Sequence, residues 1–309
     1  MAFYVGIDGG GTKTTCLLGD EHSVLAQASS EGSNPIRVGE QQARHALKKA
    51  VEAACDAAKV EPAKIEQTCI GLAGGARPEI SSRIQAMVAE FIGGTIQIVG
   101  DMVIALEAAH HGGPGLIVIA GTGSIAYGRN QRGNTARAGG WGFAISDEGS
   151  GHWIGREAIT AAMRAHDAGE STLLVSSIMN TWHLGTPEDV VRAANAIPPP
   201  DFATLFPPVL AAAAAGDSLA RDVLMSAATE LARLAKTVVR RLWPNEQPFP
   251  VAMSGGVFKS SALVRQVFVN SLHSEYPEAA VSSTIVEPAE GALFLARKAR
   301  GSSIPNTAT

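Results

Sequence analysis

The first residues whose types and spacing could do chemistry lie in the stretch GIDGGGTKT, which holds Asp8, a run of three glycines after it, Thr12, Lys13 and Thr14. Glycines lack a Cβ, so the backbone N–H groups of such a turn can approach an anion closely. Thr12 and Thr14 add hydroxyl donors, and Lys13 adds a cation. Asp8 would repel a phosphate, but it fits beside one when Mg²⁺ lies between them, usually through water. A tight hairpin explains one or two of these glycines, whereas the whole run favours a phosphate-binding turn.

Two common phosphate motifs describe the glycine turns of this chain poorly. A P-loop has glycine immediately before its lysine and leads into a helix, whereas here Thr12 precedes Lys13 and TTCLLG continues as a strand. A second turn at residues 121–126 (GTGSIA) formally matches the dinucleotide pattern GxGxxA. It should open a helix, yet the sequence breaks into another turn within six residues. We therefore infer two glycine–hydroxyl hairpins that face a shared nucleotide.

These turns need strands on either side, and the apolar pattern supplies such strands twice. In the first half we expect an antiparallel meander at 3–8, 14–18 and 23–29, a loop at 31–40, helices at 41–59, 80–91 and 101–110, and strands at 67–75 and 95–99. In the second half we expect strands at 115–120, 124–127, 135–139, 249–256 and 279–286, helices that begin near Gly151, Pro187, Asp201 and Ser218, and helices at 260–272 and 290–300. This repetition predicts two α/β lobes with a cleft between them.

The composition bounds the class of protein. The chain has 309 residues, of which 46% are hydrophobic and 17% charged, with a formal net charge of -4. It can therefore bury a substantial core, and it lacks the basic footprint of a nucleic-acid-binding protein. Its three cysteines form no CxxC pair, which argues against a disulfide framework or a cysteine-rich zinc site. Its apolar runs are too short to span a bilayer, so we expect a cytoplasmic protein with no membrane partner.

Five motifs occur in order from residue 6 to about residue 296, namely GIDGGGTKT, DMVIAL, IAGTGSIA, GGWGFAISDEGSGHWIG and MSGGV. Together they resemble the N-acetylglucosamine kinases of the BadF/BadG/BcrA/BcrD ATPase family, in the sugar-kinase, actin and heat-shock ATPase superfamily. The resemblance implies two actin-like (ribonuclease-H-like) lobes with mixed sheets flanked by helices and ATP in the cleft. The lobes would be residues 1–112, with the helix 288–300 packing back on them, and residues 113–287. Residues 301–309 would form a flexible tail.

The resemblance also implies roles for the glycine turns. Gly10, Gly11, Thr12 and Lys13 would face the β- and γ-phosphates of ATP, and Asp8 would help to hold Mg²⁺. Gly121, Thr122, Gly123 and Ser124 match the second phosphate motif. Ser254, Gly255, Gly256 and Val257 match the adenosine motif, where missing side chains let the nucleoside lie on the backbone. A plain strand-to-helix turn explains SGG equally well on its own, and the order of the motifs favours the adenosine site.

Asp101 follows a predicted strand and opens a predicted helix. An N-cap aspartate is a common structural explanation for such a position. The resemblance instead implies the general base that takes the proton from the sugar hydroxyl, and both roles are compatible.

The stretch GGWGFAISDEGSG is the expected sugar-binding loop. Trp141 offers a flat face on which a sugar ring can stack, although a buried core tryptophan is the alternative. Gly142 lies beside it. Asp147 can accept hydrogen bonds from sugar hydroxyls, or it can cap the following helix, and Glu148 could do either. Asn34 matches a sugar-contact position of the family, or it is a turn residue before Pro35.

The predicted function is ATP-dependent phosphorylation of the 6-hydroxyl of N-acetylglucosamine. Glucosamine and N-acetylmuramic acid are alternative acceptors. The lactyl carboxylate of N-acetylmuramic acid would need either room or a cation, which Arg137 or Arg77 could supply. An activator ATPase of CoA-ester dehydratases is disfavoured because no cysteine lies beyond Cys69 to hold an iron–sulfur cluster. The expected partners are a small amino sugar and a second copy of the chain, as a homodimer.

Overall fold

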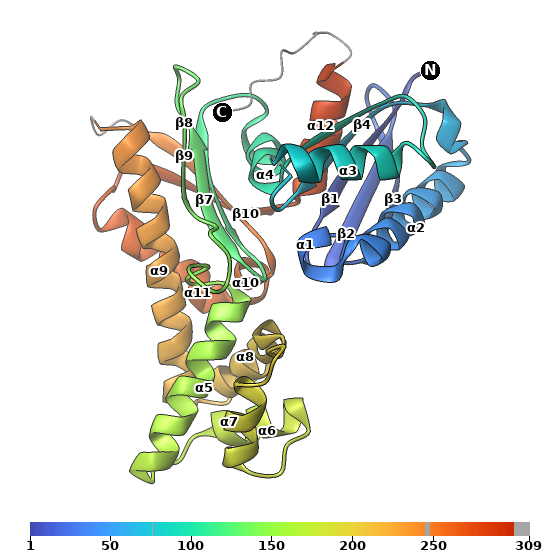
Figure 1. Cartoon of the computed structure of the whole chain (residues 1–309). Coiled ribbons are helices and arrows are strands. Elements are labelled where there is room, and N and C mark those ends of the chain that lie inside the picture. The colour runs from blue at the N-terminus through green and yellow to red at the C-terminus, as the bar shows by residue number, and fades with distance from the viewer. Residues whose placement is uncertain (76, 245–247, 300–309) are drawn as a thin grey trace. The chain divides into compact units, whose positions relative to one another are not determined.

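The computed structural model describes residues 1–75, 77–244 and 248–299, so the tail expected at 301–309 lies outside the described residues. The contacts divide the chain into two compact units (Figure 1). The first unit comprises Met1–Ile117 and the described residues from Val286 onward, and the second comprises Val118–Ile285.

The first unit is built on a mixed five-stranded sheet in the order β3-β2-β1-β4-β5. Its strands are β1 (Phe3–Gly9), β2 (Lys13–Gly19), β3 (Val24–Glu31), β4 (Ile65–Leu72) and β5 (Thr95–Gly100). The first three form the expected antiparallel meander, whereas β4 and β5 run parallel to β1. The helices are α1 (Pro35–Val38), α2 (Glu40–Ala58), α3 (Pro78–Val88), α4 (Asp101–His110) and α12 (Pro288–Lys298).

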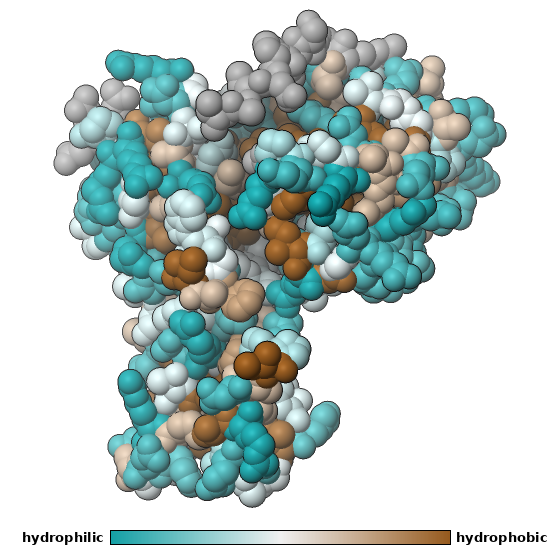
Figure 2. Space-filling view, in the orientation of Figure 1, coloured by the Kyte–Doolittle hydropathy of each residue, from teal (hydrophilic) through white to brown (hydrophobic). Residues whose placement is uncertain are grey.

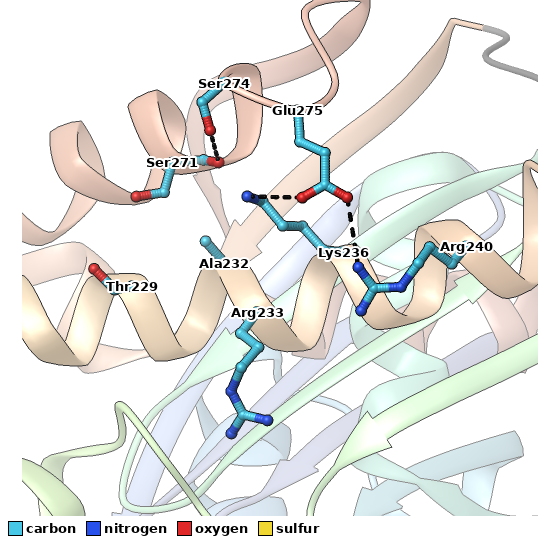
Figure 3. Close-up of a pocket in the computed structure, with 8 residues that line it drawn as sticks. All are labelled: Thr229, Ala232, Arg233, Lys236, Arg240, Ser271, Ser274 and Glu275. Atoms are coloured by element: carbon cyan, nitrogen blue, oxygen red, sulfur yellow. Dashed lines mark hydrogen bonds and ion pairs between the residues drawn. The ribbon is translucent and has the colours of Figure 1, made fainter.

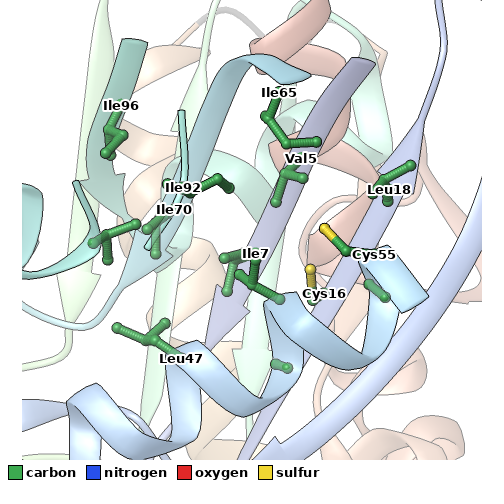
Figure 4. Close-up of a cluster of buried hydrophobic side chains, with 14 of the residues drawn as sticks. Val5, Ile7, Cys16, Leu18, Leu47, Cys55, Ile65, Ile70, Ile92 and Ile96 are labelled. Carbon is green, nitrogen blue, oxygen red and sulfur yellow. The ribbon is translucent and has the colours of Figure 1, made fainter. Parts of the chain in front are cut away.

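Both faces of this sheet are buried, and successive residues of β1 serve opposite faces. Val5 and Ile7 point into a cluster beneath α2, together with Cys16, Leu47 and Ile70, as Figure 4 shows. Tyr4 belongs to the second cluster, with Ile104 of α4 and Leu293 of α12. The sheet is thereby fixed between helices, and its carboxyl edge becomes a rigid platform.

Helix α12 packs on β1 and α4 because two glycines allow close approach. A Cβ on Gly6 would lie 2.2 Å from the backbone nitrogen of Leu293, and one on Gly291 would lie 1.9 Å from the carbonyl oxygen of Ile104. Neither position accepts a larger residue without moving the helix. The last helix therefore returns to the first unit, although it follows the whole second unit in sequence.

The second unit repeats this topology. Its strands are β6 (Gly115–Ala120), β7 (Ser124–Arg129), β8 (Thr135–Gly139), β9 (Phe249–Ser254) and β10 (Ala279–Val286), in the order β10-β9-β6-β7-β8. Read from β8, this is the order of the first sheet, with β6 in the place of β1. The expected fold class of two sheets flanked by helices is thus confirmed.

The helices of the second unit differ from the expected set in two places. They are α5 (Gly151–Ala168), α6 (Leu173–Trp182), α7 (Pro187–Ala194), α8 (Phe206–Ala214), α9 (Ser218–Leu242), α10 (Gly256–Ser260) and α11 (Ala262–His273). Helix α6 was not predicted. The single helix predicted at 260–272 is wrong at its start, because Ser261 separates α10 from α11 and caps α11 by accepting from the Val264 N–H at 3.2 Å.

The face of the molecule in Figure 2 is mostly hydrophilic, and its apolar residues reach the surface in small, separate patches. No helix in the described part of the chain is long and apolar enough to cross a membrane.

Candidate functional site

The first glycine turn joins β1 to β2. The Gly10 N–H donates to the Lys13 carbonyl at 3.0 Å, and the Ser33 N–H donates to the Gly10 carbonyl at 3.0 Å. A Cβ on Gly11 would lie 2.8 Å from Cδ of Arg37. The glycines therefore let the turn pack closely against residues 32–37, while Thr12 and Lys13 stay exposed at its tip.

Thr14 does not serve this turn as a phosphate donor, so that expectation is wrong. Its side chain is fully buried. Its hydroxyl donates to the Glu31 carbonyl at 2.7 Å and lies 2.8 Å from Oγ of Ser33. Thr14 instead fastens the hairpin to β3 and to the segment that follows it.

Asp8 and Asp101 lie at the carboxyl edge of the first sheet. Asp8 is paired with Gly71 of β4, and Asp101 directly follows β5, whose Gly100 is paired with Leu72. Burial, followed by the negative charges of Asp101 and Glu287, raises the pKa of Asp8 to about 7, while Lys13 acts in the opposite direction. The strand ends thus bring together carboxyl groups that are 93 residues or more apart in sequence.

Asp101 is the first residue of α4 and not its N-cap, which is Gly100. Its Oδ1 accepts from the Met102 N–H at 2.9 Å. Burial raises the pKa of the Asp101 carboxyl, although the backbone N–H groups of Met102 and Asp101 act in the opposite direction. A carboxylate with a raised pKa at a strand end has the properties of a general base.

Asn34 is the N-cap of α1, whereas its structural alternative was a turn residue before Pro35. Its Oδ1 accepts from the Ile36 N–H at 3.0 Å, and Pro35 occupies the first helical position. This short helix corrects the prediction of a continuous loop at 31–40. Within the described residues the Nδ2 amide of Asn34 has no partner, so the side chain can cap the helix and still donate to a ligand.

The second glycine turn joins β6 to β7 and is held from behind by the loop that precedes α5. The Gly121 N–H donates to the Gly123 carbonyl at 2.9 Å, and the His152 N–H donates to the Thr122 carbonyl at 3.3 Å. The Ser124 hydroxyl donates to the Glu148 carbonyl at 2.8 Å. Ser124 is buried and its hydroxyl is hydrogen-bonded within the protein, whereas Gly121 and Thr122 are partly exposed.

Asp147 lies against this second turn. Its Oδ1 accepts from the Ser124 N–H at 3.4 Å, and a Cβ on Gly123 would lie 3.0 Å from its Oδ2. Its alternative role as a helix cap is wrong, because Ser150 caps α5 by accepting from the Trp153 N–H at 3.2 Å. The backbone of Asp147 is left-handed, with φ of 68°. An aspartate held in this way beside the second glycine turn is a candidate for binding a sugar hydroxyl.

Trp141 is 65% exposed, which excludes the buried-core alternative. The Arg137 guanidinium lies 4.0 Å from the centre of its ring. The adjoining glycines Gly140 and Gly142 have φ of 69° and 94°, a conformation that favours glycine. The loop therefore presents an indole face, with Phe143 and Ile145 also exposed beyond it.

The two glycines after β9 differ in what surrounds them. Gly255 has φ of 99°, and a Cβ there would lie 2.4 Å from the Ala120 carbonyl oxygen. Gly256 is exposed, and a Cβ there would meet nothing within 4 Å. Gly255 is thus required by the fold, while Gly256 leaves open backbone where a nucleoside could lie.

Two charged residues near these turns were not predicted. Arg37 lies against Gly11, and Glu287 acts on the Asp8 carboxyl. The dipeptide Asn34–Pro35 is a helix-start signal that could have placed Arg37 on a helix beside the turn. No local signal places Glu287, because only the return of α12 to the first unit brings it near Asp8.

Comparisons with known proteins show the family of this chain. The model of the BadF/BadG/BcrA/BcrD ATPase family matches residues 5–296. An N-acetylmuramic acid/N-acetylglucosamine kinase of Clostridium acetobutylicum is 33% identical over 96% of this chain and 99% of the relative. An N-acetyl-D-glucosamine kinase of Dictyostelium discoideum is 29% identical over 95% of this chain and 97% of the length of that relative. A solved structure of a proposed N-acetylglucosamine kinase from Chromobacterium violaceum is 27% identical, with a TM-score of 0.74. The match covers 96% of this chain and 99% of that chain.

Proposed function

The chain belongs to the BadF/BadG/BcrA/BcrD ATPase family, and from that premise we propose that it is an ATP-dependent kinase that phosphorylates the 6-hydroxyl of N-acetylglucosamine. The observation that carries this proposal is the gathering of Asp8 and Asp101 at one sheet edge, beside a glycine hairpin whose tip exposes Thr12 and Lys13. A phosphoryl transfer needs these parts: a cradle for phosphate, a carboxylate for the metal and a carboxylate for the acceptor.

In the proposed reaction Asp101 accepts the proton of the sugar 6-hydroxyl as its oxygen forms a bond to the γ-phosphorus. The bond between that phosphorus and the bridging oxygen of ADP breaks, and ADP leaves. The raised pKa of Asp101 brings its basicity closer to neutral pH, which favours proton transfer. Gly11, Thr12, Lys13, Thr122 and Gly123 of the two glycine turns would contribute backbone and side-chain donors to the phosphates. Gly10 and Ser124, whose donors bind within the protein, would instead shape the turns.

The residues at this edge fit a magnesium ion held mainly by phosphate and water. Among the described residues no three His, Cys, Asp or Glu side chains are grouped so as to hold a metal by themselves. Yet Asp8 has a neighbouring carboxyl and a raised pKa, so a cation would relieve the repulsion around it. Asp8 would hold Mg²⁺ through water, and the ion would neutralise charge on the phosphates.

The acceptor would be recognised by Trp141, Gly142, Asp147 and Asn34. The exposed indole suits an apolar sugar face or an acetyl methyl group, and Asp147 can accept from hydroxyls. The Arg137 guanidinium lies over the Trp141 ring, and a cation there favours a neutral N-acetyl sugar over the ammonium of glucosamine. An activator ATPase remains disfavoured because the three cysteines, Cys16, Cys55 and Cys69, are all buried in the first unit.

The proposed function is tested by measuring ATP consumption with N-acetylglucosamine, glucosamine, N-acetylmannosamine and glucose. We expect N-acetylglucosamine to give the highest kcat/KM. Asp101→Asn should lower kcat by about 10²- to 10⁴-fold without weakening ATP binding, because it removes the base and keeps the shape. Absence of sugar-stimulated ATP use in the wild type would overturn the kinase assignment. A highest kcat/KM for glucosamine would overturn only the choice of acceptor.

A further inference from the structure

Arg137 and Trp141 form a stacked pair in the proposed sugar loop. Arg137 lies in β8, opposite Tyr127 of β7, and its guanidinium carbon is 4.0 Å from the centre of the Trp141 ring. A planar guanidinium stacks well on an indole face and stays fully charged. The stack therefore holds the charge of the half-buried Arg137 in one orientation beside the exposed Trp141.

Arg137 has no anionic partner among the described residues, unlike Lys236 and Arg240 of the same unit. Between α9 and α11 a cavity of about 360 Å³ is lined by Arg233, Lys236 and Arg240, and Figure 3 shows two of these bound to Glu275. Lys236 lies 3.1 Å and Arg240 3.4 Å from the Glu275 carboxylate. The Arg137 side chain makes no ion pair or hydrogen bond with any residue that the structure describes. Its five donors remain for a ligand.

The backbone of Arg137 is fixed, which makes the side chain suitable for recognition. The Arg241 guanidinium donates to the Arg137 carbonyl at 3.0 Å, and the β7–β8 ladder holds the strand on its other side. The glycines Gly139 and Gly140 then turn the chain into the loop that carries Trp141 and Asp147. A rigid, unpaired guanidinium in this place matches a planar carboxylate, which it can bind through two parallel hydrogen bonds.

We propose that Arg137 is a specificity-determining residue that binds a carboxylate on the acceptor sugar. The acceptors of this chain would then include acidic N-acetylhexosamines, of which N-acetylmuramic acid, with its 3-O-lactyl group, is the test compound. This inference rests on the proposed kinase function and on the assignment of the Trp141 loop to the sugar. It adds a second acceptor to N-acetylglucosamine and names the residue that admits it.

The experiment compares kcat/KM for N-acetylglucosamine, N-acetylmuramic acid and the methyl ester of N-acetylmuramic acid, whose carboxylate is masked. Arg137→Met keeps the length of the side chain and removes the charge and donors. We expect this variant to lower kcat/KM for N-acetylmuramic acid about ten- to hundredfold, because it loses a charge-assisted hydrogen bond to the carboxylate. The values for N-acetylglucosamine and for the ester should change less than about threefold. Arg137→Lys should recover part of the loss, since it keeps the charge without the planar fork.

Arg132→Met is the matched control, because Arg132 is exposed in the turn between the same two strands and its loss changes the net charge equally. It should leave all three substrates unaffected. Calorimetric binding of each sugar to the wild type and to Arg137→Met gives a readout independent of turnover. Equal losses for all sugars, or a raised KM for ATP, would show that Arg137 serves the loop or the nucleotide and would overturn the proposal. Phosphorylation of N-acetylglucosamine without any of N-acetylmuramic acid would overturn it too, while leaving the proposed function intact.

Discussion

Asp8 shows how a single residue can be costly to the fold and useful to a ligand. Its pKa is raised to about 7 by burial and by the charges of Asp101 and Glu287. A carboxyl that binds its proton more tightly in the folded chain than in the unfolded chain stabilises the fold at acidic pH. That stabilisation is lost as the pH rises from about 4 to about 7. The ligand-free protein therefore keeps a repulsive site that a cation would relieve.

We predict that Asp8→Asn flattens the pH dependence of stability in the ligand-free protein. Asparagine carries no charge at any pH, so the variant should lose less of its unfolding free energy than the wild type between pH 5 and pH 8. The difference should be about 2 to 4 kcal/mol at most, because one pKa unit corresponds to about 1.4 kcal/mol. Urea unfolding at the two pH values measures it. A residual decline is expected from Asp101, whose pKa burial also raises.

Asp20→Asn provides the opposite case in the same experiment. The N–H groups of His22 and Ser23 donate to the exposed Asp20 carboxylate and hold its pKa below the ordinary value. The contribution of Asp20 to the free energy of unfolding is complete above the pKa of an unfolded aspartate and is lost only in acid. The unfolding free energy of this variant should therefore differ from that of the wild type by the same amount at pH 5 and pH 8. Parallel declines of Asp8→Asn and the wild type would contradict the assigned repulsion.

The residue types in the first glycine turn indicated phosphate-binding chemistry, but they did not indicate which partner each side chain contacts in the fold. Thr12 and Thr14 were equivalent in the sequence, yet one is exposed at the turn and the other is buried against Glu31 and Ser33. Their separation follows from the strand boundary, because Thr12 lies in the turn before β2 begins at Lys13, whereas Thr14 lies in the strand and faces inward. Which member of a hydroxyl pair is structural therefore depended on a strand boundary, the least certain part of the sequence interpretation.

At the scale of elements, the sequence predicted regular segments well where a strong signal marks both ends. Helix α4 and strand β6 have the predicted bounds, because Asp101 begins the one and glycines border the other. Helix α6 was missed although its polar residues recur at helical spacing, at Ser176, Ser177, Asn180 and Thr181. The break between α10 and α11 was missed because Ser261 is one of two adjacent serines, and only the hydrogen bond to Val264 distinguishes the cap.

The turn after β9 allows structural and ligand roles of glycine to be separated. Gly255→Ala should destabilise the fold by about 1–3 kcal/mol or more, because it combines a left-handed backbone with a Cβ 2.4 Å from the Ala120 carbonyl oxygen. Gly256→Ala and Gly256→Val meet open space, so the Ala variant should keep its melting temperature and both should raise KM for ATP. Thermal melts and steady-state kinetics measure the two effects. An unchanged KM for ATP in Gly256→Val would remove adenosine from this turn.

At the scale of the whole molecule, the two sheets share one topology, and each places a glycine turn after its central strand. The turn between β1 and β2 in the first unit corresponds to the turn between β6 and β7 in the second. The surroundings of the two turns differ: the first packs against residues 32–37, and the second against Asp147, Glu148 and α5. The duplicated framework was visible in the sequence as a repeated order of strands. The residues that pack against the two turns could not be read in the same way, because they come from segments distant along the chain.

We predict that one nucleotide protects both turns. With Mg²⁺ and a non-hydrolysable ATP analogue, hydrogen–deuterium exchange should slow several-fold in peptides that cover residues 9–13 and in those that cover 121–124, because their N–H groups would be bound to phosphate. Peptides from α7 (Pro187–Ala194), which carries none of the proposed nucleotide residues, should exchange as before. Slower exchange in the turn of one unit alone would contradict the prediction, because it would mean that only that turn binds the nucleotide. Protection of both turns that Asp8→Asn weakens would tie the two units to the same magnesium–nucleotide complex.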